Sequence, residues 1–299
     1  MLTAAGSTNA SSLSLSERRD AFRKLMNFSE SNVAIGSVEE LVLPGPESPI
    51  SIRVYSPVET GADRLPGLVF FHGGGLVAGS LDTHEGICRR LANETGFRLV
   101  SVDYRLAPEH KFPAAVTDGY VATIWVVEHA AELRIDRDRI AVGGDSAGAT
   151  LAAIVCQMAK QAPGVKLAAQ LLLCPIMDFG AETESRSAFG AGYLLDKATM
   201  DRDLEHYVPA GLDPADPRIS PLRALDFDGL PPAHIHTAEF DPLRDEGRAY
   251  ADRLTRAGIE VNYTCHPGMI YLFYGMAGVI PYARIAMKDI GAEFKAALG

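Results

Sequence analysis

The amino-acid sequence predicts an α/β fold with a mostly parallel central sheet and helices on both of its faces. First, short apolar segments alternate with longer amphipathic ones along most of the chain, as strands joined by helical crossovers do. Second, Leu68–Phe71 is apolar throughout, as a strand buried on both faces must be. Third, 299 residues with 47% hydrophobic side chains can build a sizeable core within one domain.

The expected elements follow in chain order. Ser14 and Glu17 form a capping box, which predicts the start of a helix. A strand over 38–43 precedes one over 50–55 that alternates apolar and polar residues, as an antiparallel pair covered on one side does. Beyond 68–71 we expect strands at 99–102, 140–142, 169–174, 233–236 and 259–265, and helices at 83–93, 114–132, 150–162, 243–257 and 282–298.

One interval interrupts this alternation, because residues 179–230 contain several prolines and no clear strand. We predict that residues 1–40 form an N-terminal cap segment and residues 179–225 a cap insertion, together covering the strand ends. The core then comprises residues 41–178 and 226–299, in a single domain overall.

Composition excludes several classes of partner. The formal net charge of −10 argues against nucleic acid and against an anionic membrane surface. No apolar run reaches the ~18 residues of a membrane span, and the Ser/Thr-rich start lacks the apolar core of a signal peptide, so we expect a cytoplasmic protein. The scattered cysteines lack C-x-x-C spacing and predict buried free thiols without a metal: Cys88, Cys156, Cys174 and Cys265.

A short apolar strand runs into glycines, presents one serine and continues directly into an Ala-rich segment. Residues Gly144 to Gly148 spell Gly-Asp-Ser-Ala-Gly, which fits the G-x-S-x-G nucleophile elbow. The turn is so sharp that side chains two positions before or after the serine would collide. Its strained geometry lifts the hydroxyl clear of the sheet, and the following helix points its N–H groups at the reacting centre. Ser146 is therefore the candidate nucleophile.

A run of glycines, His72–Gly75, follows the strand that ends at Phe71. Acyl transfer needs donors aimed at the oxygen that becomes negative in the tetrahedral intermediate. Successive glycines allow backbone N–H groups to face that oxygen, and an HGGG pattern supplies the second half of the oxyanion hole beside a G-x-S-x-G elbow.

The same glycines also resemble a dinucleotide-binding loop. Asp103 ends the next strand, where a ribose-binding acid would lie, and Tyr193 with Lys197 has the spacing of the Tyr-x-x-x-Lys pair of short-chain dehydrogenases. That pair, however, falls in the irregular interval, and a dehydrogenase does not need a serine elbow. We therefore favour acyl transfer.

Four motifs in this order resemble the hormone-sensitive-lipase branch of the α/β-hydrolases: 72–75, 103–109, 143–148 and 239–246. The resemblance covers the chain from about residue 40 onward. It implies the α/β-hydrolase fold with a helical cap, and hydrolysis of a small ester substrate through an acyl-enzyme without cofactor or metal. It also implies a homodimer through the last strand and helix.

By this resemblance Ser146 is the nucleophile and Asp241 the acid, and the N–H groups of Gly74, Gly75 and Ala147 form the oxyanion hole. Position supports Asp241 independently, because it follows a predicted strand within a few residues, and sites of α/β proteins assemble at the carboxyl ends of strands.

The acid must also follow the serine in the required chain order. Asp245 and Glu246 are rivals for the acid position, and we expect them instead in a solvated first helical turn.

The base position departs from the family's pattern, whose last motif is G-x-x-H-G-F. Here Tyr271 stands in place of the histidine and Leu272 in place of the glycine. A phenol with a pKa of about 10 is a poor proton acceptor near neutrality, and it has no second nitrogen for Asp241 to orient. Losing a triad histidine costs on the order of 10⁶ in kcat. His266 is the nearest substitute base.

Two functions remain open. The first is a serine-dependent carboxylic ester hydrolase for short acyl esters, impaired by Tyr271. The second is a catalytically weak or inactive scaffold that binds a small apolar ligand, as the plant gibberellin receptors do, relatives that have lost the same histidine. Retention of Ser146, Asp241 and the glycines favours the first. The expected pocket residues are apolar: Leu76, Phe189, Tyr193 and Leu194.

Overall fold

The computed structural model describes residues 13–29, 32–58 and 63–298. The parts of the predicted cap at 1–12 and 30–31 lie outside the described residues. The strands are β1 Ser37–Leu43, β2 Ile50–Ser56, β3 Leu65–Phe71, β4 Arg98–Asp103, β5 Ile135–Asp145, β6 Gln170–Leu173, β7 Ala233–Phe240 and β8 Val261–Ile270. The helices are α1 Leu15–Met26, α2 Glu85–Thr95, α3 Ala114–Glu128, α4 Ala147–Ala159, α5 Glu184–Phe189, α6 Lys197–Tyr207, α7 Arg244–Arg256 and α8 Pro281–Leu298, with short 3₁₀ turns η2 Pro221–Arg223 and η3 Phe273–Met276.

The eight strands form one sheet in the order β1-β2-β4-β3-β5-β6-β7-β8. Strands β1 and β2 pair antiparallel, β2 pairs antiparallel with β4, and the remaining neighbours are parallel. The predicted mostly parallel sheet with an antiparallel pair at its start is thus confirmed. Because parallel strands end at one edge, the loops after β3, β5, β7 and β8 all lie on the same side.

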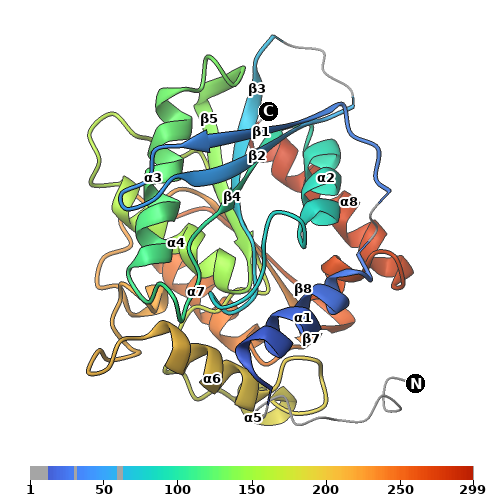
Figure 1. Cartoon of the computed structure of the whole chain (residues 1–299), viewed down its shortest axis with the longest axis vertical. Helices are drawn as coiled ribbons and strands as arrows, with labels where there is room; N and C mark the ends of the chain where they lie inside the picture. The colour runs from blue at the N-terminus through green and yellow to red at the C-terminus, as the bar shows by residue number, and fades with distance from the viewer. Residues whose placement is uncertain (1–12, 30–31, 59–62, 299) are drawn as a thin grey trace.

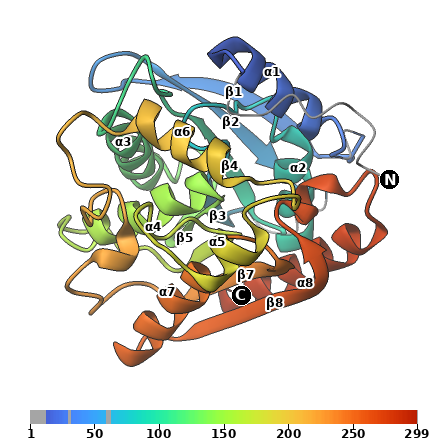
Figure 2. The same cartoon turned by 90° about the horizontal axis from the view of Figure 1, so that it is seen from below.

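Helices cover both faces of the sheet, as Figures 1 and 2 show: α2 and α8 lie on one face, and α3 and α4 on the other. The capping box at Ser14 is present, with its hydroxyl accepting from the N–H of Glu17. Helix α2 ends at Gly96, whose φ of 71° is the left-handed conformation common at helix ends. Helices α1, α5 and α6 lie together beyond the carboxyl ends of the strands (Figure 2).

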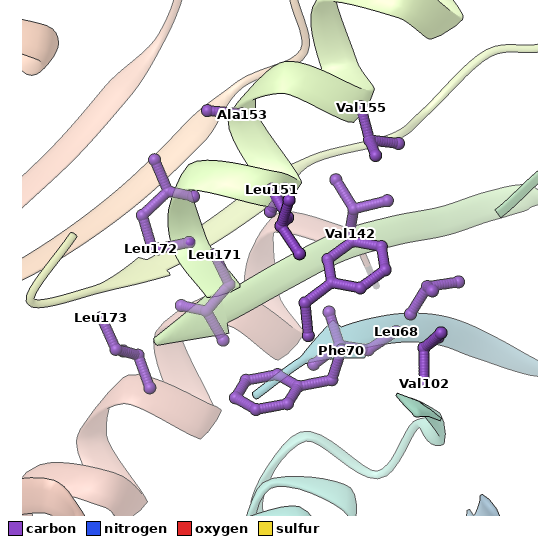
Figure 3. Close-up of a cluster of buried hydrophobic side chains, with 14 of the residues drawn as sticks. Leu68, Phe70, Val102, Val142, Leu151, Ala153, Val155, Leu171, Leu172 and Leu173 are labelled. Carbon is purple, nitrogen blue, oxygen red and sulfur yellow. The ribbon is translucent and has the colours of Figure 1, made fainter. Parts of the chain in front are cut away.

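Part of the hydrophobic core lies where β3 and β5 meet α4. Figure 3 shows Phe70, Val142 and Leu151 converging there, and each is fully buried. Residues Leu68–Phe71 are buried on both faces, as their unbroken apolar run predicts. Burying a large apolar side chain contributes about 1.5–3 kcal/mol, so this layer holds the elbow between β5 and α4 on a rigid base.

The bounds of several elements differ from the sequence prediction. Strand β8 continues through Pro267 and Gly268 to Ile270, because a register shift between Ala238 and Phe240 restores its pairing with β7. The interval 179–230, in which no strand is expected and for which the resemblance implies a helical cap, contains α5, α6 and η2. Capping side chains define both helices, since Thr183 accepts from Arg186 N and Asp196 from Thr199 N.

Within the described ranges, none of the helices combines the length and the apolar composition that crossing a bilayer requires.

Candidate active site

The three residues aligned with a catalytic triad each follow a strand of the parallel part of the sheet. Ser146 comes directly after β5, Asp241 after β7 and Tyr271 after β8. All three are buried, with exposed fractions of 2%, 0% and 6%. Because these strands are parallel and end on one side, they bring together groups that are far apart in the sequence.

Ser146 occupies the strained turn that the elbow motif predicts. Its φ of 53° and ψ of −119° are unfavourable for a residue with a side chain. A Cβ added at Gly144 would lie 2.4 Å from the Gly148 carbonyl, and one added at Gly148 would lie 2.0 Å from the carbonyl oxygen of Phe71. The predicted collision on both sides of the serine is thereby confirmed, and it explains why both positions are glycine.

The three predicted oxyanion donors are free to bind a ligand. Among the described residues, no acceptor bonds the backbone N–H groups of Gly74, Gly75 or Ala147. Gly74 and Gly75 have φ of 119° and 70°, conformations that glycine adopts without strain. Ala147 opens α4, so its N–H lies at the positive end of the helix dipole. The donor set therefore suits a developing negative charge.

Asp145 connects the elbow to the glycine loop, a role the sequence analysis missed. Its Oδ1 accepts from Gly73 N at 2.9 Å, and its Oδ2 lies 3.3 Å from His84 Nε2. His84 is fully buried. On the other side of the loop, Tyr104 stacks on His72 and donates to its carbonyl oxygen at 2.5 Å. Both contacts fix the path of the glycine backbone.

Tyr271 contacts the candidate nucleophile directly. Its hydroxyl donates to Ser146 Oγ at 2.7 Å. Burial, the largest influence, raises the pKa of Tyr271 well above its usual value, and the negative charges of Asp145 and Asp241 act in the same direction. The phenol is therefore neutral at physiological pH and is a donor, so it cannot remove the proton of Ser146.

Asp241 has one oxygen satisfied and one without a partner. Oδ1 accepts from Leu243 N at 2.8 Å, whereas Oδ2 is buried and has no hydrogen-bond partner in the described structure. Burial raises the pKa of Asp241 to about 6, while the Leu243 N–H and the neighbouring Cys174 thiol lower it. An unpaired buried carboxylate oxygen is costly, and an imidazole N–H is the donor that a triad places there.

Leu272 adopts a backbone conformation suited to the glycine that it replaces. Its φ is 61° and its ψ is 14°, the left-handed region that costs a residue with a side chain roughly 1–2 kcal/mol. Its side chain is nevertheless buried and packs against Gly275. The loop after β8 therefore keeps a glycine-type backbone with a leucine in it.

His266 has both ring nitrogens near groups other than Ser146. Its Nδ1 lies 3.1 Å from the Tyr282 hydroxyl, and its Nε2 lies 3.3 Å from His236 Nδ1. It belongs to β8 itself, not to the end of that strand or the loop beyond, and it packs on Phe273. Burial lowers the pKa of His266. These contacts give no support to His266 as the substitute base.

A cavity of about 180 Å³ opens over Ser146. It is roofed by α1 and α6 and reaches Gly74, Gly75 and Tyr271. Most of its remaining lining is apolar, including Phe22, Leu25, Ile176, Leu194, Leu195 and Met200. Of the four residues expected in the pocket, the structure places Leu194 in the lining.

The other three expected pocket residues lie elsewhere, which corrects that prediction. Tyr193 stacks on Phe240 with ring centroids 5.8 Å apart, and Phe189 meets the same ring edge-on at 5.6 Å. Leu76 is 1% exposed and belongs to the main core. Aromatic stacking and burial satisfy these side chains away from the cavity.

Arg19 fastens α1 to the body of the protein. Its Nε donates to Val77 O at 2.8 Å and its Nη2 to Ala107 O at 3.1 Å. The same guanidinium binds both carboxylate oxygens of Glu109, at 2.8 and 2.7 Å. Its hydrogen bonds, the largest influence, lower the pKa of Glu109 to about 2. The motif at 103–109 thus holds the roof of the cavity in place.

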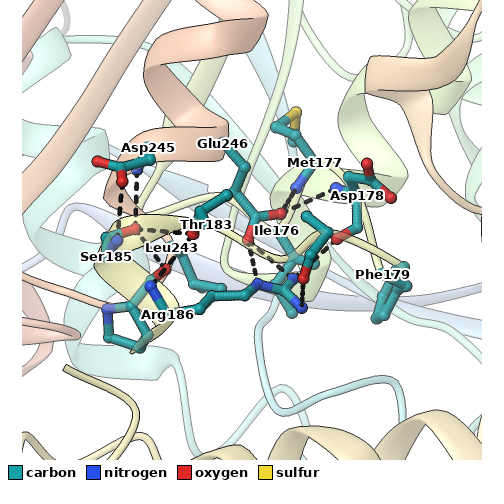
Figure 4. Close-up of polar contacts among 12 residues, drawn as sticks. Ile176, Met177, Asp178, Phe179, Thr183, Ser185, Arg186, Leu243, Asp245 and Glu246 are labelled. Atoms are coloured by element: carbon teal, nitrogen blue, oxygen red, sulfur yellow. Dashed lines mark hydrogen bonds and ion pairs between the residues drawn. The ribbon is translucent and has the colours of Figure 1, made fainter. Parts of the chain in front are cut away.

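Glu246 is not solvated, contrary to the sequence prediction. It is 1% exposed, and its Oε2 accepts from Met177 N at 2.7 Å and Asp178 N at 2.8 Å. Arg186 donates to its Oε1 at 2.9 Å. Figure 4 shows this carboxylate enclosed by the segment that follows β6. Burial raises the pKa of Glu246 to about 7, with Arg186 acting in the opposite direction.

The sequence is similar to those of an α/β-hydrolase family and of several esterases. Residues 68–275 match the family described as alpha/beta hydrolase fold. The carboxylic ester hydrolase LipN of Mycobacterium tuberculosis is 47% identical over 75% of this chain, which spans 61% of the length of LipN. The carboxylesterase NlhH of the same species is 43% identical over 83% of this chain and 79% of its own length.

Solved structures of esterases are also similar to this chain. The ester-hydrolase EH1AB1 from the metagenome of Lake Arreo has a TM-score of 0.94 at 43% identity, covering 97% of this chain and 93% of its own. An esterase of Pyrobaculum calidifontis has a TM-score of 0.91 at 39% identity, covering 97% and 95%. These similarities confirm the predicted fold and the predicted class of enzyme, a carboxylesterase-type hydrolase.

Proposed function

Because this chain belongs to the alpha/beta hydrolase family, we propose that it is a serine-dependent carboxylic ester hydrolase for short acyl esters. The supporting observation is the position of Ser146, on a strained elbow under a small apolar cavity and beside three N–H groups without acceptors. The esterase relatives support the same reaction class.

The reaction would run in two steps. Ser146 Oγ attacks the ester carbonyl carbon, and the carbonyl oxygen becomes an oxyanion held by the N–H groups of Gly74, Gly75 and Ala147. Collapse of this intermediate breaks the bond to the alcohol oxygen, which leaves with a proton from water. Water then attacks the acyl-enzyme in the same way and releases the acid.

Proton removal is the weak point of this site. Tyr271 donates to Ser146 instead of accepting from it, so solvent water or hydroxide must take the serine proton. By comparison with serine hydrolases that lose their histidine, we expect turnover reduced by a factor on the order of 10⁶. Asp241, without an imidazole to orient, contributes little to the rate.

Intact-mass spectrometry after incubation with p-nitrophenyl acetate tests this proposal. We expect an acetyl adduct that maps to the peptide containing Ser146 and is absent from Ser146→Ala. An adduct retained by Ser146→Ala, or no adduct at any pH up to the alkaline limit of stability, would contradict the proposed nucleophile.

A second function is favoured by the hydrogen bond between Tyr271 and Ser146. The Tyr271 hydroxyl is hydrogen-bonded to Ser146, and the cavity above Ser146 stays open. This arrangement suits a scaffold that binds a small apolar ligand. The two functions differ in one outcome: a pure scaffold binds short esters without ever forming the acetyl adduct.

Two further features concern the assembly of the protein and its division into a cap and a core. Strand β8 is an edge of the sheet, and edge strands offer unpaired backbone groups to a second chain. We therefore propose a homodimer through β8 and α8, which light scattering coupled to size-exclusion chromatography will test. We also retain the division into a cap and a core, since α1 and α6 supply the roof of the cavity.

A further inference from the structure

An ion pair joins the two halves of the cavity roof. Arg18 of α1 donates through Nη2 to Asp203 Oδ2 of α6 at 2.8 Å. Both residues line the cavity, and Asp203 is only 6% exposed. The guanidinium also lies over the ring of Phe22, 5.5 Å from its centroid. Charge and stacking therefore fix this pair in the roof, where Asp196, Thr199 and Asp201 also line the cavity beside apolar side chains.

The pair is incompletely satisfied. Arginine and aspartate commonly form two parallel hydrogen bonds, but here only one is present. In the described structure, the buried Nε of Arg18 and the buried Oδ1 of Asp203 have no hydrogen-bond partner. One ion pair thus contains one spare donor and one spare acceptor. Leaving a buried polar group unpaired is unfavourable, so a ligand that pairs both would gain affinity.

The pair lies close to the proposed reaction centre. A Cβ built on Gly75 would be 2.1 Å from Asp203 Oδ2, so the carboxylate packs against the glycine whose N–H is an oxyanion donor. A group that bonds Asp203 must therefore lie only a few bonds from the ester carbonyl. Only a glycine fits beneath this carboxylate, which couples the oxyanion loop to α6.

We propose that the Arg18–Asp203 pair is a polar subsite that binds a hydroxyl group carried near the ester carbonyl of the substrate. A hydroxyl both donates and accepts, so it can donate to Asp203 Oδ1 and accept from Arg18 Nε. An ammonium group lacks an acceptor and a second carboxylate lacks a donor, so neither satisfies both atoms. The substrate class is then a short hydroxy-ester, such as a β-hydroxybutyrate ester, whose remaining carbons contact the apolar lining.

This inference rests on the proposed function for the position of the carbonyl, yet binding can test it without turnover. The probes are methyl butyrate and methyl β-hydroxybutyrate, the latter as each enantiomer. Their dissociation constants are measured by ligand-observed NMR with the full chain carrying Ser146→Ala, which prevents hydrolysis. We expect at least one enantiomer of the hydroxy-ester to bind about tenfold more tightly than methyl butyrate, as a net hydrogen bond allows.

The matched variants remove the subsite without leaving a buried charge. Arg18→Met combined with Asp203→Leu deletes both partners. A single change would leave the other charge buried without a partner. We expect the double variant to bind the two esters with equal affinity. Glu205→Gln removes an exposed carboxylate of the same helix and should keep the tenfold preference. Circular dichroism confirms that each variant is folded.

The outcomes separate this inference from the proposed function. Equal binding of both esters by the parent, or a preference that survives in the double variant, overturns the subsite even if the protein hydrolyses esters. A preference that the double variant loses supports the subsite even if no acetyl adduct ever forms on Ser146. If neither ester binds, the subsite is wrong, and the adduct experiment alone decides the function.

Discussion

The Tyr271 hydroxyl donates to Ser146 Oγ at 2.7 Å, so the residue in the position of the base holds the nucleophile as a hydrogen-bond acceptor. This reverses the arrangement of a working triad, in which the nucleophile donates to its base. Behind this pair, Asp241 Oδ2 has no partner in the described structure.

Replacing Tyr271 by His together with Leu272 by Gly should raise turnover of p-nitrophenyl butyrate by at least a thousandfold. The imidazole can accept the serine proton and can donate to the unpaired oxygen of Asp241, and glycine relieves the left-handed backbone at 272. Steady-state kinetics provide the measurement. Adding Ser146→Ala to this variant should abolish the gain, and a gain that persists would show that the new activity bypasses Ser146.

The pH dependence of turnover should differ between the parent and this variant. Without an imidazole, water or hydroxide takes the serine proton, so the parent's kcat should rise about tenfold per pH unit across the alkaline range. The variant should instead reach a plateau above the pKa of its histidine, near the usual value of about 6.5. A plateau in the parent near neutrality would indicate a base that the structure does not place at Ser146.

Asp241→Asn should stabilise the parent at neutral pH. The pKa of Asp241 is raised from 3.8 to about 6, so the folded state favours the protonated form. Its contribution to stability is fully present below pH 3.8 and is lost as pH rises through about 6. Removing the charge should therefore increase the free energy of unfolding at pH 7 by on the order of 1 kcal/mol.

Urea unfolding at pH 4 and pH 7 measures this effect. The gain from Asp241→Asn should be much smaller at pH 4, where the parent carboxyl is largely protonated. An equal gain at both pH values would mean that packing rather than charge is responsible.

Arg19→Met should loosen the roof of the cavity. The change removes two hydrogen bonds to backbone carbonyls and the pair with the half-exposed Glu109, a loss on the order of 1 kcal/mol. In the Tyr271→His and Leu272→Gly background, KM should rise several-fold with kcat less affected. Arg23→Met is the control, because Arg23 is exposed and pairs with Asp20 of the same helix. Similar effects of the two variants would argue against a specific anchor.

His266→Ala should leave the parent's activity unchanged and lower its stability. Its ring nitrogens face Tyr282 and His236, so its loss opens a cavity in the layer between β8 and α8, at a cost on the order of 1 kcal/mol. Loss of the acetyl adduct on Ser146 in folded His266→Ala would instead restore His266 as the substitute base.

Much of the fold could be predicted because strands buried on both faces are visible as unbroken apolar runs. Leu68–Phe71 is an example, and the glycines around Ser146 define the turn by sterics alone. The cap helices could not be predicted in the same way, since α6 is polar and its start depends on Asp196 capping Thr199 N.

Long-range polar contacts also could not be predicted from the sequence. A glutamate in a first helical turn is usually solvated, but Glu246 is enclosed by backbone N–H groups about 70 residues away in sequence and by Arg186. The pocket residues were inferred from hydrophobicity, and Tyr193 and Phe189 instead satisfy each other and Phe240. The role of Asp145 required knowing that the loop at Gly73 folds against it.

The order of synthesis matters for a cavity built in this way. Its roof includes Arg18 and Phe22 of the first helix, and its wall includes Tyr271, which follows the last strand. Residues up to Tyr271 must therefore leave the ribosome before α1 and Tyr271 can line the same cavity. A nascent chain stalled before β8 should expose the apolar side of α1 to chaperones, and completion of β8 should release them.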